Sequence, residues 1–216
     1  MQIECLDDGG IFIHQEAYCK KILNRFEMNE CNSVSTPMEK GSITTDQSEP
    51  LPAVVPYREA IDSLMFLAIV SRPDISYAIG VLSQVLDKPQ QVHWNMTKRI
   101  KRYLKGTEKC GILFQSKKDS QITLQCYTNS DYAGDPLSRR STSGMIFLSN
   151  GGAVSWRSQR QNCIALSTTE AEFVAASQAA KVAIWLGNLL RELQCISTIP
   201  VLQMNNPKCY EISEKP

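Results

Sequence analysis

The sequence predicts an α/β protein of the α+β kind, in which a small helical subdomain precedes a mixed sheet with one long helix. Three observations support this fold class. Apolar residues recur at helical spacing between residues 57 and 104. Beyond Gly106 they alternate with polar residues, as they do in half-buried strands. One long helical pattern then covers residues 170–193.

The composition is that of ordinary globular material. Of the 216 residues, 43% are hydrophobic and 21% are charged, which fits one or two domains. The 23 Lys and Arg and the 22 Asp and Glu give a net charge of +1, so overall charge implies neither a nucleic-acid nor a membrane partner. The 8 cysteines form no Cys-x-x-Cys pair, and only 2 histidines accompany them, which argues against a zinc site.

The amino terminus lacks the pattern of a secretory leader. Glu4, Asp7 and Asp8 stand where a leader needs a basic and then an apolar stretch. No run approaches the ~20 apolar residues that would span a membrane. We therefore expect an intracellular protein of the cytoplasm or nucleus, with reduced cysteines, no membrane contact and no secretion.

Residues 1–30 predict a β-hairpin followed by a helix. Short apolar runs at residues 2–6 and 11–14 flank a turn whose Asp-Gly and Gly-Gly pairs supply the positive φ that a hairpin needs. The helix is predicted over residues 15–26. Its apolar stripe consists of Tyr18, Ile22, Leu23 and Phe26.

Residues 31–56 predict a linker, because Ser, Thr, Pro, Gly and acids dominate this stretch. Three helices are predicted after it. They cover residues 57–70, a segment from an Asp74 cap to residue 86, and residues 91–104. We expect the three helices to pack together as a helical connection over residues 57–106.

Residues 107–216 predict the mixed sheet. The strand candidates are residues 110–114, 122–128, 145–148, 153–156 and 200–204. The long helix precedes the last of these strands. Its buried stripe is predicted to consist of Phe173, Ala176, Ala180, Ala183 and Leu190.

Eight motifs carry a resemblance to a known family. In chain order the later four are Cys-Tyr-Thr-Asn-Ser-Asp-Tyr-Ala-Gly-Asp (126–135), Arg-Arg-Ser-Thr-Ser-Gly (139–144), Ser-Trp-Arg-Ser-Gln-Arg-Gln (155–161) and Ala-Leu-Ser-Thr-Thr-Glu-Ala-Glu-Phe (165–173). They resemble the ribonuclease H domain of copia-type retrotransposons. The earlier four are Ser-Thr-Pro-Met (35–38), Tyr-Arg-Glu-Ala (57–60), Ser-Arg-Pro-Asp (71–74) and Arg-Tyr-Leu-Lys-Gly-Thr (102–107). They resemble the segment that joins reverse transcriptase to that domain.

The resemblance, to a Ty1/copia-type Pol polyprotein, covers essentially the whole chain. It implies a reverse transcriptase tail in residues 1–30 and a truncated ribonuclease H-like domain in residues 107–216, with the linker and the helical connection between them. Because only about a dozen residues follow the strand at 200–204, we expect that strand to be a bare sheet edge. Residues 107–216 alone are then expected to be marginally stable.

The family's ribonuclease H cuts the RNA of an RNA–DNA hybrid with two Mg²⁺ ions held by four carboxylates. By position, the first three are here Asn129, Glu172 and Asn205, and the fourth would lie beyond Pro216. An amide carries no charge, and each unit charge at ~4 Å is worth on the order of 4 kcal/mol at an effective dielectric near 20. Mg²⁺ is therefore the cofactor of the family, but the resemblance predicts no bound metal and no nuclease activity for this chain.

Two carboxylates near these positions each have two interpretations. Asp131 shares the strand face of Asn129, so it is either a substitute metal ligand or an ordinary loop residue. Glu172 is the surviving metal ligand by family position. Overlapping capping boxes within residues 167–172 would instead make it a helix cap, a role for which the resemblance favours Glu170.

A basic cluster lies on the predicted helix 91–104 and just beyond it. It consists of Lys98, Arg99, Lys101, Arg102 and Lys105, interleaved with Trp94 and Tyr103. The cluster either contacts phosphates or is a solvated helix face with two core aromatics. The partners that the resemblance implies are an RNA–DNA hybrid or another nucleic acid, and the upstream polymerase domain of the parent polyprotein.

Three functional hypotheses stay open from the sequence. The first is a catalytically inactive fragment of a Pol polyprotein. The second is a domesticated nucleic-acid or protein binding module, which includes a host or effector-like protein. The third is a live ribonuclease H, which would need another residue to compensate for the lost carboxylates. Whether the chain is an enzyme therefore depends on whether its metal site can still bind Mg²⁺.

Overall fold

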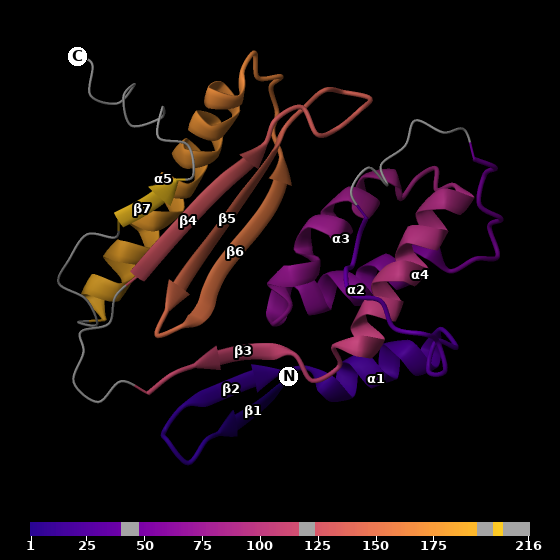
Figure 1. Cartoon of the computed structure of the whole chain (residues 1–216), viewed down its shortest axis with the longest axis horizontal. Helices are drawn as coiled ribbons and strands as arrows, with labels where there is room; N and C mark the ends of the chain where they lie inside the picture. Colours follow the sequence, from indigo (N-terminus) through magenta and orange to yellow (C-terminus); the bar gives the residue numbers. More distant parts are fainter. Residues whose placement is uncertain (40–47, 117–123, 194–200, 205–216) are drawn as a thin grey trace. The chain divides into compact units, whose positions relative to one another are not determined.

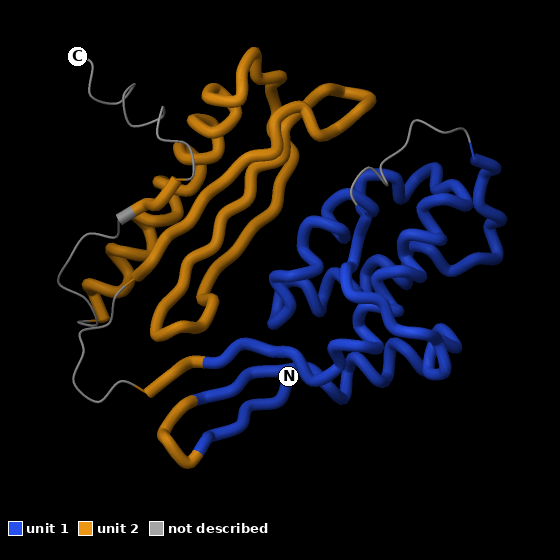
Figure 2. The backbone as a smooth tube through the Cα atoms, in the orientation of Figure 1, with its two compact units in different colours: residues 1–6, 11–113 blue, residues 7–10, 114–216 orange. Residues whose placement is uncertain are grey.

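The computed structural model describes residues 1–39, 48–116, 124–193 and 201–204 (Figure 1). The described chain forms two compact units (Figure 2). Unit 1 comprises Met1–Leu6 and Ile11–Leu113, and unit 2 comprises Asp7–Gly10 and Phe114–Pro216. The mixture of helices with two sheets confirms the predicted α/β class.

The helices of unit 1 enclose a core of large aliphatic side chains. They are α1 (Glu16–Arg25), α2 (Tyr57–Val70), the short 3-10 helix η1 (Pro73–Ile75), α3 (Ser76–Leu82), the 3-10 helix η2 (Ser83–Val85) and α4 (Gln91–Gly106). Leu64 of α2, Ile79 of α3 and Ile100 of α4 are fully buried in this core. The apolar stripe predicted for α1 is confirmed, because Ile22 and Leu23 are buried and Tyr18 and Phe26 pack against the core.

The helix predicted from Asp74 to residue 86 is broken into η1, α3 and η2. Asp74 is not its cap, because the residue lies inside η1 and its carboxylate accepts hydrogen bonds from Arg72 and Tyr103. A buried guanidinium competes for this carboxylate more strongly than backbone N–H groups do. Pro73 begins η1, since proline favours the first turn of a helix.

The described parts of the predicted linker pack on unit 1. Met38 and Leu51 contact its hydrophobic core. The backbone N–H of Leu51 donates to the Pro89 carbonyl at 3.0 Å, beside a β-bridge between Pro50 and Gln90. These isolated contacts hold a segment whose composition could not form a core of its own.

A three-stranded sheet joins the predicted hairpin to a later strand. Its order is β1 (Gln2–Cys5), β2 (Ile11–His14) and β3 (Gly111–Phe114). The hairpin prediction is confirmed, with Gly9 at a φ of 82° in its turn. The strand predicted at residues 110–114 was assigned to the wrong sheet. A Cβ at Gly111 would lie 2.3 Å from the Ile13 carbonyl oxygen, so only glycine permits this close approach of β3 to β2.

Unit 2 contains a mixed four-stranded sheet in the order β6-β5-β4-β7. Its strands are β4 (Leu124–Asp131), β5 (Thr142–Ser149), β6 (Gly152–Arg160) and β7 (Val201–Met204). β4 pairs antiparallel with β5 and parallel with β7, and β5 pairs antiparallel with β6. The parallel pair requires a crossover, which α5 (Thr168–Glu192) provides. β7 is an end strand of the described sheet, and Pro200, predicted in this strand, lies outside the described residues.

The helix α5 lies along one face of the sheet (Figure 1). It contacts the sheet through alanines. Ala175, Ala179 and Ala183 are buried at a spacing of one helical turn, above Cys126 and Phe147. The predicted stripe was wrong at Phe173, which is 50% exposed. Small side chains let the helix backbone approach the strands, so the helix turns its alanines rather than its aromatic residue inward.

Among the described residues, α5 is the one helix long and apolar enough to cross a membrane by length and composition. The sequence expectation that no segment approaches this length was therefore too strict. A core helix passes the same test. The buried alanine face places α5 in the core of unit 2.

Candidate functional site

The first turn of α5 holds Glu172 against β4. The Ser130 backbone N–H donates to Glu172 Oε1 at 3.1 Å. The residue is 7% exposed, and its Oε2 has no hydrogen-bond partner. Burial raises the pKa of this carboxyl, and the Ser130 N–H opposes that rise only in part. The environment therefore disfavours the full negative charge that a metal ligand needs.

Asn129 lies on β4 next to this contact but on the other side of the sheet. Cys126 and Thr128 are buried beneath α5, and side chains alternate along a strand. The exposed Asn129 side chain therefore falls on the face that α5 does not cover. Asn205, the third family position, lies outside the described residues.

Asp131 is the last residue of β4 and pairs with Thr142 of β5. Its Oδ1 accepts a hydrogen bond from the Thr142 backbone N–H across the hairpin. A Cβ at Gly134 would lie 2.1 Å from Asp131 Oδ2, so glycine makes room for the carboxylate. Burial raises the pKa of Asp131, and the Thr142 contacts oppose that rise. These contacts engage the Asp131 carboxylate at the end of the β4–β5 pair, so Asp131 is a strand residue rather than a loop residue.

The carboxylates that the structure describes in unit 2 do not converge. Within the described residues, no group of three or more His, Cys, Asp and Glu side chains could hold a metal ion. Asp135, the nearest further acid along the chain, is bound by Arg160 at 2.7 Å. Burial alone would raise the pKa of Asp135, but hydrogen bonds from Ser138 and Arg160 lower it to about 2.

A buried glutamine that the sequence did not single out links the sheet to α5. Gln161 Nε2 donates to Ser143 Oγ at 3.0 Å and to the Ala171 carbonyl at 2.9 Å, and it lies 3.3 Å from Ser130 Oγ. Its Oε1 has no hydrogen-bond partner. Gln161 ends the motif at residues 155–161, which is the only signal in the sequence that could have pointed to it.

The helix cap of α5 is built by other residues than Glu172. Ser167 is the N-cap, and its Oγ accepts from the Glu170 N–H at 3.1 Å. Glu170 Oε2 in turn accepts from the Leu166 N–H at 2.7 Å. The predicted capping box is therefore met on the Ser167 side, whereas Glu170 binds the N–H of Leu166 and not that of the N-cap residue. Glu172 is thereby left for the contact with β4.

The basic cluster on α4 is not a uniformly exposed face. Lys101 is 0% exposed, and its Nζ lies 3.6 Å from the centroid of the Phe26 ring and 4.3 Å from that of Trp94. This Nζ has no hydrogen-bond partner. Burial lowers the pKa of Lys101 to about 7, and the nearby charge of Lys98 lowers it further. In this conformation Lys101 cannot reach a phosphate.

Three other cations of the cluster have partners within unit 1. Arg99 Nη1 lies 2.6 Å from Glu39 Oε1, and Lys105 Nζ lies 3.2 Å from Glu108 Oε1. Arg102 Nε donates to the Asn32 carbonyl at 2.8 Å. Lys98 is partly exposed. The structure thus brings Lys98, Arg99, Arg102 and Lys105 onto one helix but gives most of them internal acceptors.

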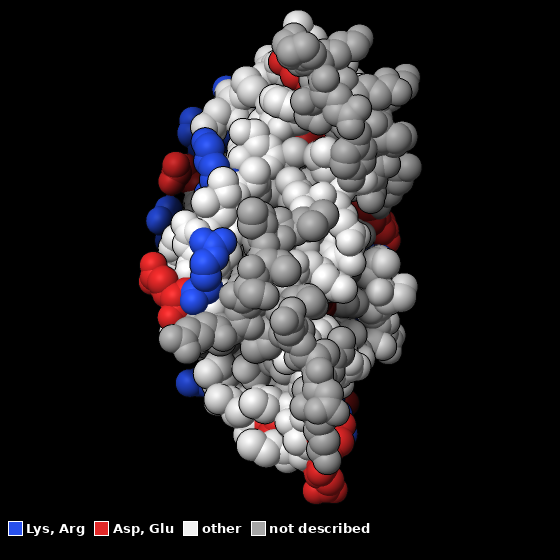
Figure 3. Space-filling model, turned by 90° about the vertical axis from the view of Figure 1, so that its left-hand side faces the viewer, with Lys and Arg blue, Asp and Glu red and all other residues white. Residues whose placement is uncertain are grey.

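In the view of Figure 3 the described residues show no large surface of one charge. That view faces the side of Figure 1 on which α5 and β7 lie. The Lys and Arg side chains gather along one edge and alternate there with Asp and Glu. Mixed signs partly cancel, so this face does not attract a polyanion as a basic patch would.

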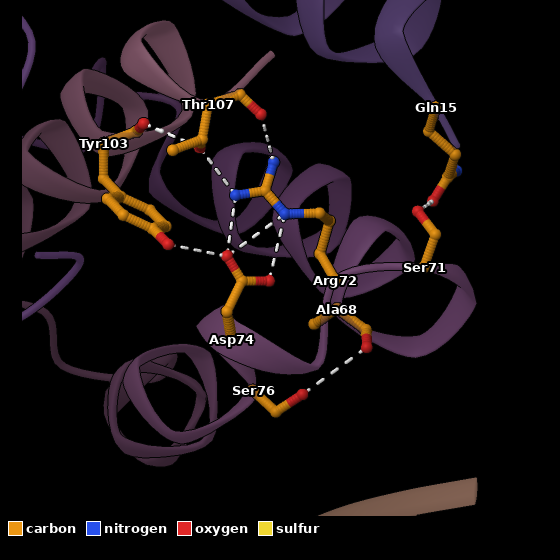
Figure 4. Close-up of polar contacts among 8 residues, drawn as sticks. All are labelled: Gln15, Ala68, Ser71, Arg72, Asp74, Ser76, Tyr103 and Thr107. Carbon is orange, nitrogen blue, oxygen red and sulfur yellow. Dashed lines mark hydrogen bonds and ion pairs between the residues drawn. The ribbon is translucent and has the colours of Figure 1, made fainter. Parts of the chain in front are cut away.

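Two motifs of unit 1 meet in a bonded network (Figure 4). Arg72, which is 1% exposed, donates from Nη2 to Asp74 Oδ2 at 2.7 Å and from Nη1 to the Thr107 carbonyl at 2.8 Å. The Tyr103 hydroxyl donates to the same Asp74 oxygen at 2.9 Å. Residues 71–74 and 102–107 are therefore joined by charge-assisted hydrogen bonds, which assigns both motifs a structural role.

Comparisons with known proteins identify several relatives. The chain is 42% identical over 190 residues to the retrovirus-related Pol polyprotein from transposon TNT 1-94 of Nicotiana tabacum, which covers 85% of this chain. It is 32% identical to the uncharacterized mitochondrial protein AtMg00810 of Arabidopsis thaliana, over 82% of this chain and 72% of that protein. It is 47% identical to the secreted RxLR effector protein 161 of Plasmopara viticola, over 61% of this chain and 92% of that protein.

The relatives differ in how much of their own length this chain spans. The chain spans 14% of the length of the tobacco polyprotein. No protein-family model matches the chain, and no solved structure matches it. The relationship of this chain to known proteins therefore rests on its sequence identity to individual relatives.

Proposed function

Because the chain belongs to the family of Pol polyproteins of copia-type retrotransposons, we propose that it comprises the end of a reverse transcriptase and a ribonuclease H-like domain that no longer cuts RNA–DNA hybrids. The order of elements in unit 2 supports the assignment of the domain. Three antiparallel strands precede a long helix and a parallel strand. Asn129 lies on the first of these strands and Glu172 on the helix, which are the places that the family resemblance gives to two metal ligands.

The observation that carries the loss of activity is the state of Glu172. Its neighbour by family position, Asn129, is uncharged, and Glu172 itself is buried with Oε1 bonded to the Ser130 N–H. Mg²⁺ is a hard cation that binds through charged oxygens in near-octahedral geometry. One buried carboxylate on one face and an amide on the other do not fit a pair of magnesium ions. We therefore derive no metal-dependent step for this chain.

The test is a cleavage assay on a labelled RNA–DNA hybrid with Mg²⁺ and with Mn²⁺. Purified chain is expected to yield no more product than buffer, and Glu172→Ala is expected to behave identically. A bacterial ribonuclease H serves as the positive control for the substrate. Cleavage by the chain that disappears in Glu172→Ala would show that the domain is a live ribonuclease H.

A second assay asks whether the amides are the cause of inactivity. Asn129→Asp combined with Asn205→Asp restores two charges, and magnesium binding is measured by calorimetry. We expect at most weak binding, because Glu172 remains buried and bonded to β4. Strong binding together with Glu172-dependent cleavage would mean that the amides alone remove the activity.

A binding module without chemistry is the second candidate function. The observation that favours it is the identity to the RxLR effector protein, because the match covers 92% of that relative. A domesticated module of this kind, in a host or effector-like protein, would keep contact with nucleic acid or protein. Saturable hybrid binding in the absence of cleavage would support it, whereas absence of both would leave the Pol fragment.

A further inference from the structure

Residues 31–39 lie against the basic face of α4 and supply oxygen atoms to two of its arginines. Arg102 Nε donates to the Asn32 carbonyl at 2.8 Å. Arg99 Nη2 donates to Thr36 Oγ1 at 3.0 Å, and Arg99 Nη1 pairs with Glu39 Oε1 at 2.6 Å. We call residues 31–39 the strap. A carbonyl, a hydroxyl and a carboxylate of the strap thus occupy two guanidinium groups.

The bonded arginines belong to a row of cations. Arg99 and Arg102 are three positions apart on α4, so they are neighbours on its surface. Lys98 and Lys105 extend the row by one helical turn on either side of Arg102. A row of closely spaced cations on one helix face suits the regularly spaced phosphates of a nucleic-acid backbone, to which arginine and lysine are the common donors.

The strap satisfies Arg99 only in part. Arg99 Nε is buried and has no hydrogen-bond partner. A phosphate group can accept from two N–H groups of one guanidinium at once, whereas the strap binds Arg99 through two separate residues, Thr36 and Glu39. The Glu39 side chain is 65% exposed, and an ion pair with an exposed partner contributes little to stability. The contact is therefore one that a phosphate could replace.

Gly106 sets how closely the strap can lie on α4. A Cβ built at this residue would come within 3.0 Å of Ser33 Cβ, which is closer than side-chain contacts normally allow. A larger residue at position 106 would push Ser33 and its neighbours away. The strap can thus be displaced sterically, without changing any charge.

We propose that the strap is an autoinhibitory segment, which the phosphates of an RNA–DNA hybrid must displace from Arg99 and Arg102 in order to bind α4. This goes beyond the proposed function, which concerns cleavage rather than binding. It assigns Glu39 and Thr36 as competitors of phosphate. It also accounts for the motif at residues 35–38, which contacts the basic helix that the sequence analysis singled out.

The test measures hybrid binding by the full chain over a salt series, with a fluorescently labelled hybrid and anisotropy as the readout. Glu39→Gln combined with Thr36→Ala is expected to bind roughly tenfold more tightly, and its log–log salt slope should steepen by about 1 as Arg99 gains a phosphate. The matched control is Glu30→Gln, which removes the same charge from an exposed residue. Its affinity should stay within about twofold of the unmodified chain.

Two further variants separate displacement of the strap from a simple change of charge. Gly106→Val alters no charge and is also expected to tighten binding. Arg99→Ala with Arg102→Ala, added to the Glu39 and Thr36 changes, should abolish the gain. Unchanged affinity in both strap variants, or a gain that survives the loss of both arginines, would overturn the proposal.

Hydrogen exchange of the unmodified chain decides the question if a variant fails to fold by circular dichroism. Addition of hybrid should accelerate exchange in residues 31–39, and exchange that is unchanged or slower there would overturn the proposal. Product formation is read from the same samples. Cleavage would contradict the proposed function without affecting the strap, whereas absence of displacement would contradict the strap alone.

Discussion

The two units differ in which buried polar atoms lack a hydrogen-bond partner. Among the described residues these atoms are nitrogens of Gln15, Arg99 and Lys101 in unit 1 and oxygens in unit 2. In unit 1 the guanidinium of Arg72 has acceptors on Asp74 and Thr107 for all its nitrogens. In unit 2 Glu172 and Gln161 each keep a buried oxygen without a hydrogen-bond partner. A fully bonded network serves the fold, because each of its members is needed by another. Glu172 and Gln161 each have a buried acceptor atom without a donor, so the need to fold does not by itself explain these two residues.

The hydrophobic cores of the two units also differ in which side chains they contain. Leucines and isoleucines of several helices fill the core of unit 1. In unit 2, alanines of α5 face the sheet and pack in one cluster with the large side chains of Leu124 and Phe147. A core of large side chains is sensitive to truncation, whereas a helix seated on alanines is sensitive to added volume. Substitutions should therefore destabilise unit 1 mainly when they remove side-chain volume and unit 2 mainly when they add it.

The largest effect is expected at Arg72. Arg72→Ala removes the partner of Asp74 and of Thr107 in a buried site, so it should lower the free energy of unfolding by about 3–5 kcal/mol. Urea unfolding followed by tryptophan fluorescence, with Trp156 and Trp185 replaced by Phe so that only Trp94 reports, measures this. Arg58→Ala is the control, because that side chain is 65% exposed and its pair with Asp87 spans 3.4 Å. The control should lie within about 0.5 kcal/mol. A loss below about 1 kcal/mol in Arg72→Ala would show that the network does not hold unit 1.

Lys101 is one of the unit 1 residues with an unpartnered buried nitrogen, and its substitution should change stability with the opposite sign. Its folded pKa of about 7 lies below the ordinary value of 10.5 because burial disfavours the ammonium. Between these values the unfolded chain binds more protons, so stability falls as pH drops from 10.5 to 7 and is constant below. Lys101→Met should stabilise unit 1 by about 1–4 kcal/mol near neutral pH.

The pH dependence is the sharper readout for Lys101. Urea unfolding across the same pH window should show a slope in the unmodified chain that Lys101→Met removes. Lys98→Met is the matched control, since Lys98 is partly exposed on the same helix. If the slope persists in Lys101→Met, the aromatic rings stabilise the ammonium well enough to keep it charged.

Unit 2 should be sensitive to added volume on α5. Ala179 is fully buried between the helix and the sheet. Ala179→Leu is therefore expected to cost about 1–3 kcal/mol through overpacking. Ser177→Leu, at an exposed position of the same helix, should change stability by less than about 0.5 kcal/mol. Thermal unfolding of both variants by circular dichroism gives the comparison, and equal stability of the two would mean that α5 is loosely seated.

The smallest effect is expected at Glu172. Its pKa is raised above 4.5 by burial, so stability falls as pH rises from 4.5 through the folded value and is constant above it. Glu172→Gln keeps an acceptor for the Ser130 N–H and removes this penalty. The variant should be unchanged or more stable by up to about 1 kcal/mol at neutral pH. Glu192→Gln, at an exposed position, is the control. Clear destabilisation by Glu172→Gln alone would mean that the charged form is bound by a group of unit 2.

The sequence predicted local structure well where a short pattern determines it. The helix at Tyr57–Val70 has the predicted bounds, and the Gly9 turn and the Ser167 cap follow from local backbone demands. The strands around residues 142–160 are longer than predicted, because their polar outer residues pair across the sheet as well as their apolar ones. Hydrophobic periodicity in the sequence indicates which residues are buried, but it does not indicate which residues pair through their backbones.

The candidate site was predicted in its residues but not in its arrangement. The motifs pointed to Asn129, Glu172 and Asp131, and the amide at position 129 needs no structure to be recognised. The partners of these residues are far away in the chain: Ser130 for Glu172 and Thr142 for Asp131. Gln161 was missed because a single glutamine in a strand motif has no pattern that announces burial.

The sequence by itself determined the helices, the hairpin, the family resemblance and the loss of charge at position 129, because each depends on residues close together or on identity alone. The tertiary structure decided that β3 joins the amino-terminal sheet, that Phe173 faces outward and that the strap occupies Arg99 and Arg102. Each of these outcomes depends on which distant surfaces fit together. Local sequence patterns allow several ways of pairing these surfaces. The close approach of β3 to β2 at Gly111, the small residues on α5 and the oxygen atoms of the strap decide which pairing forms.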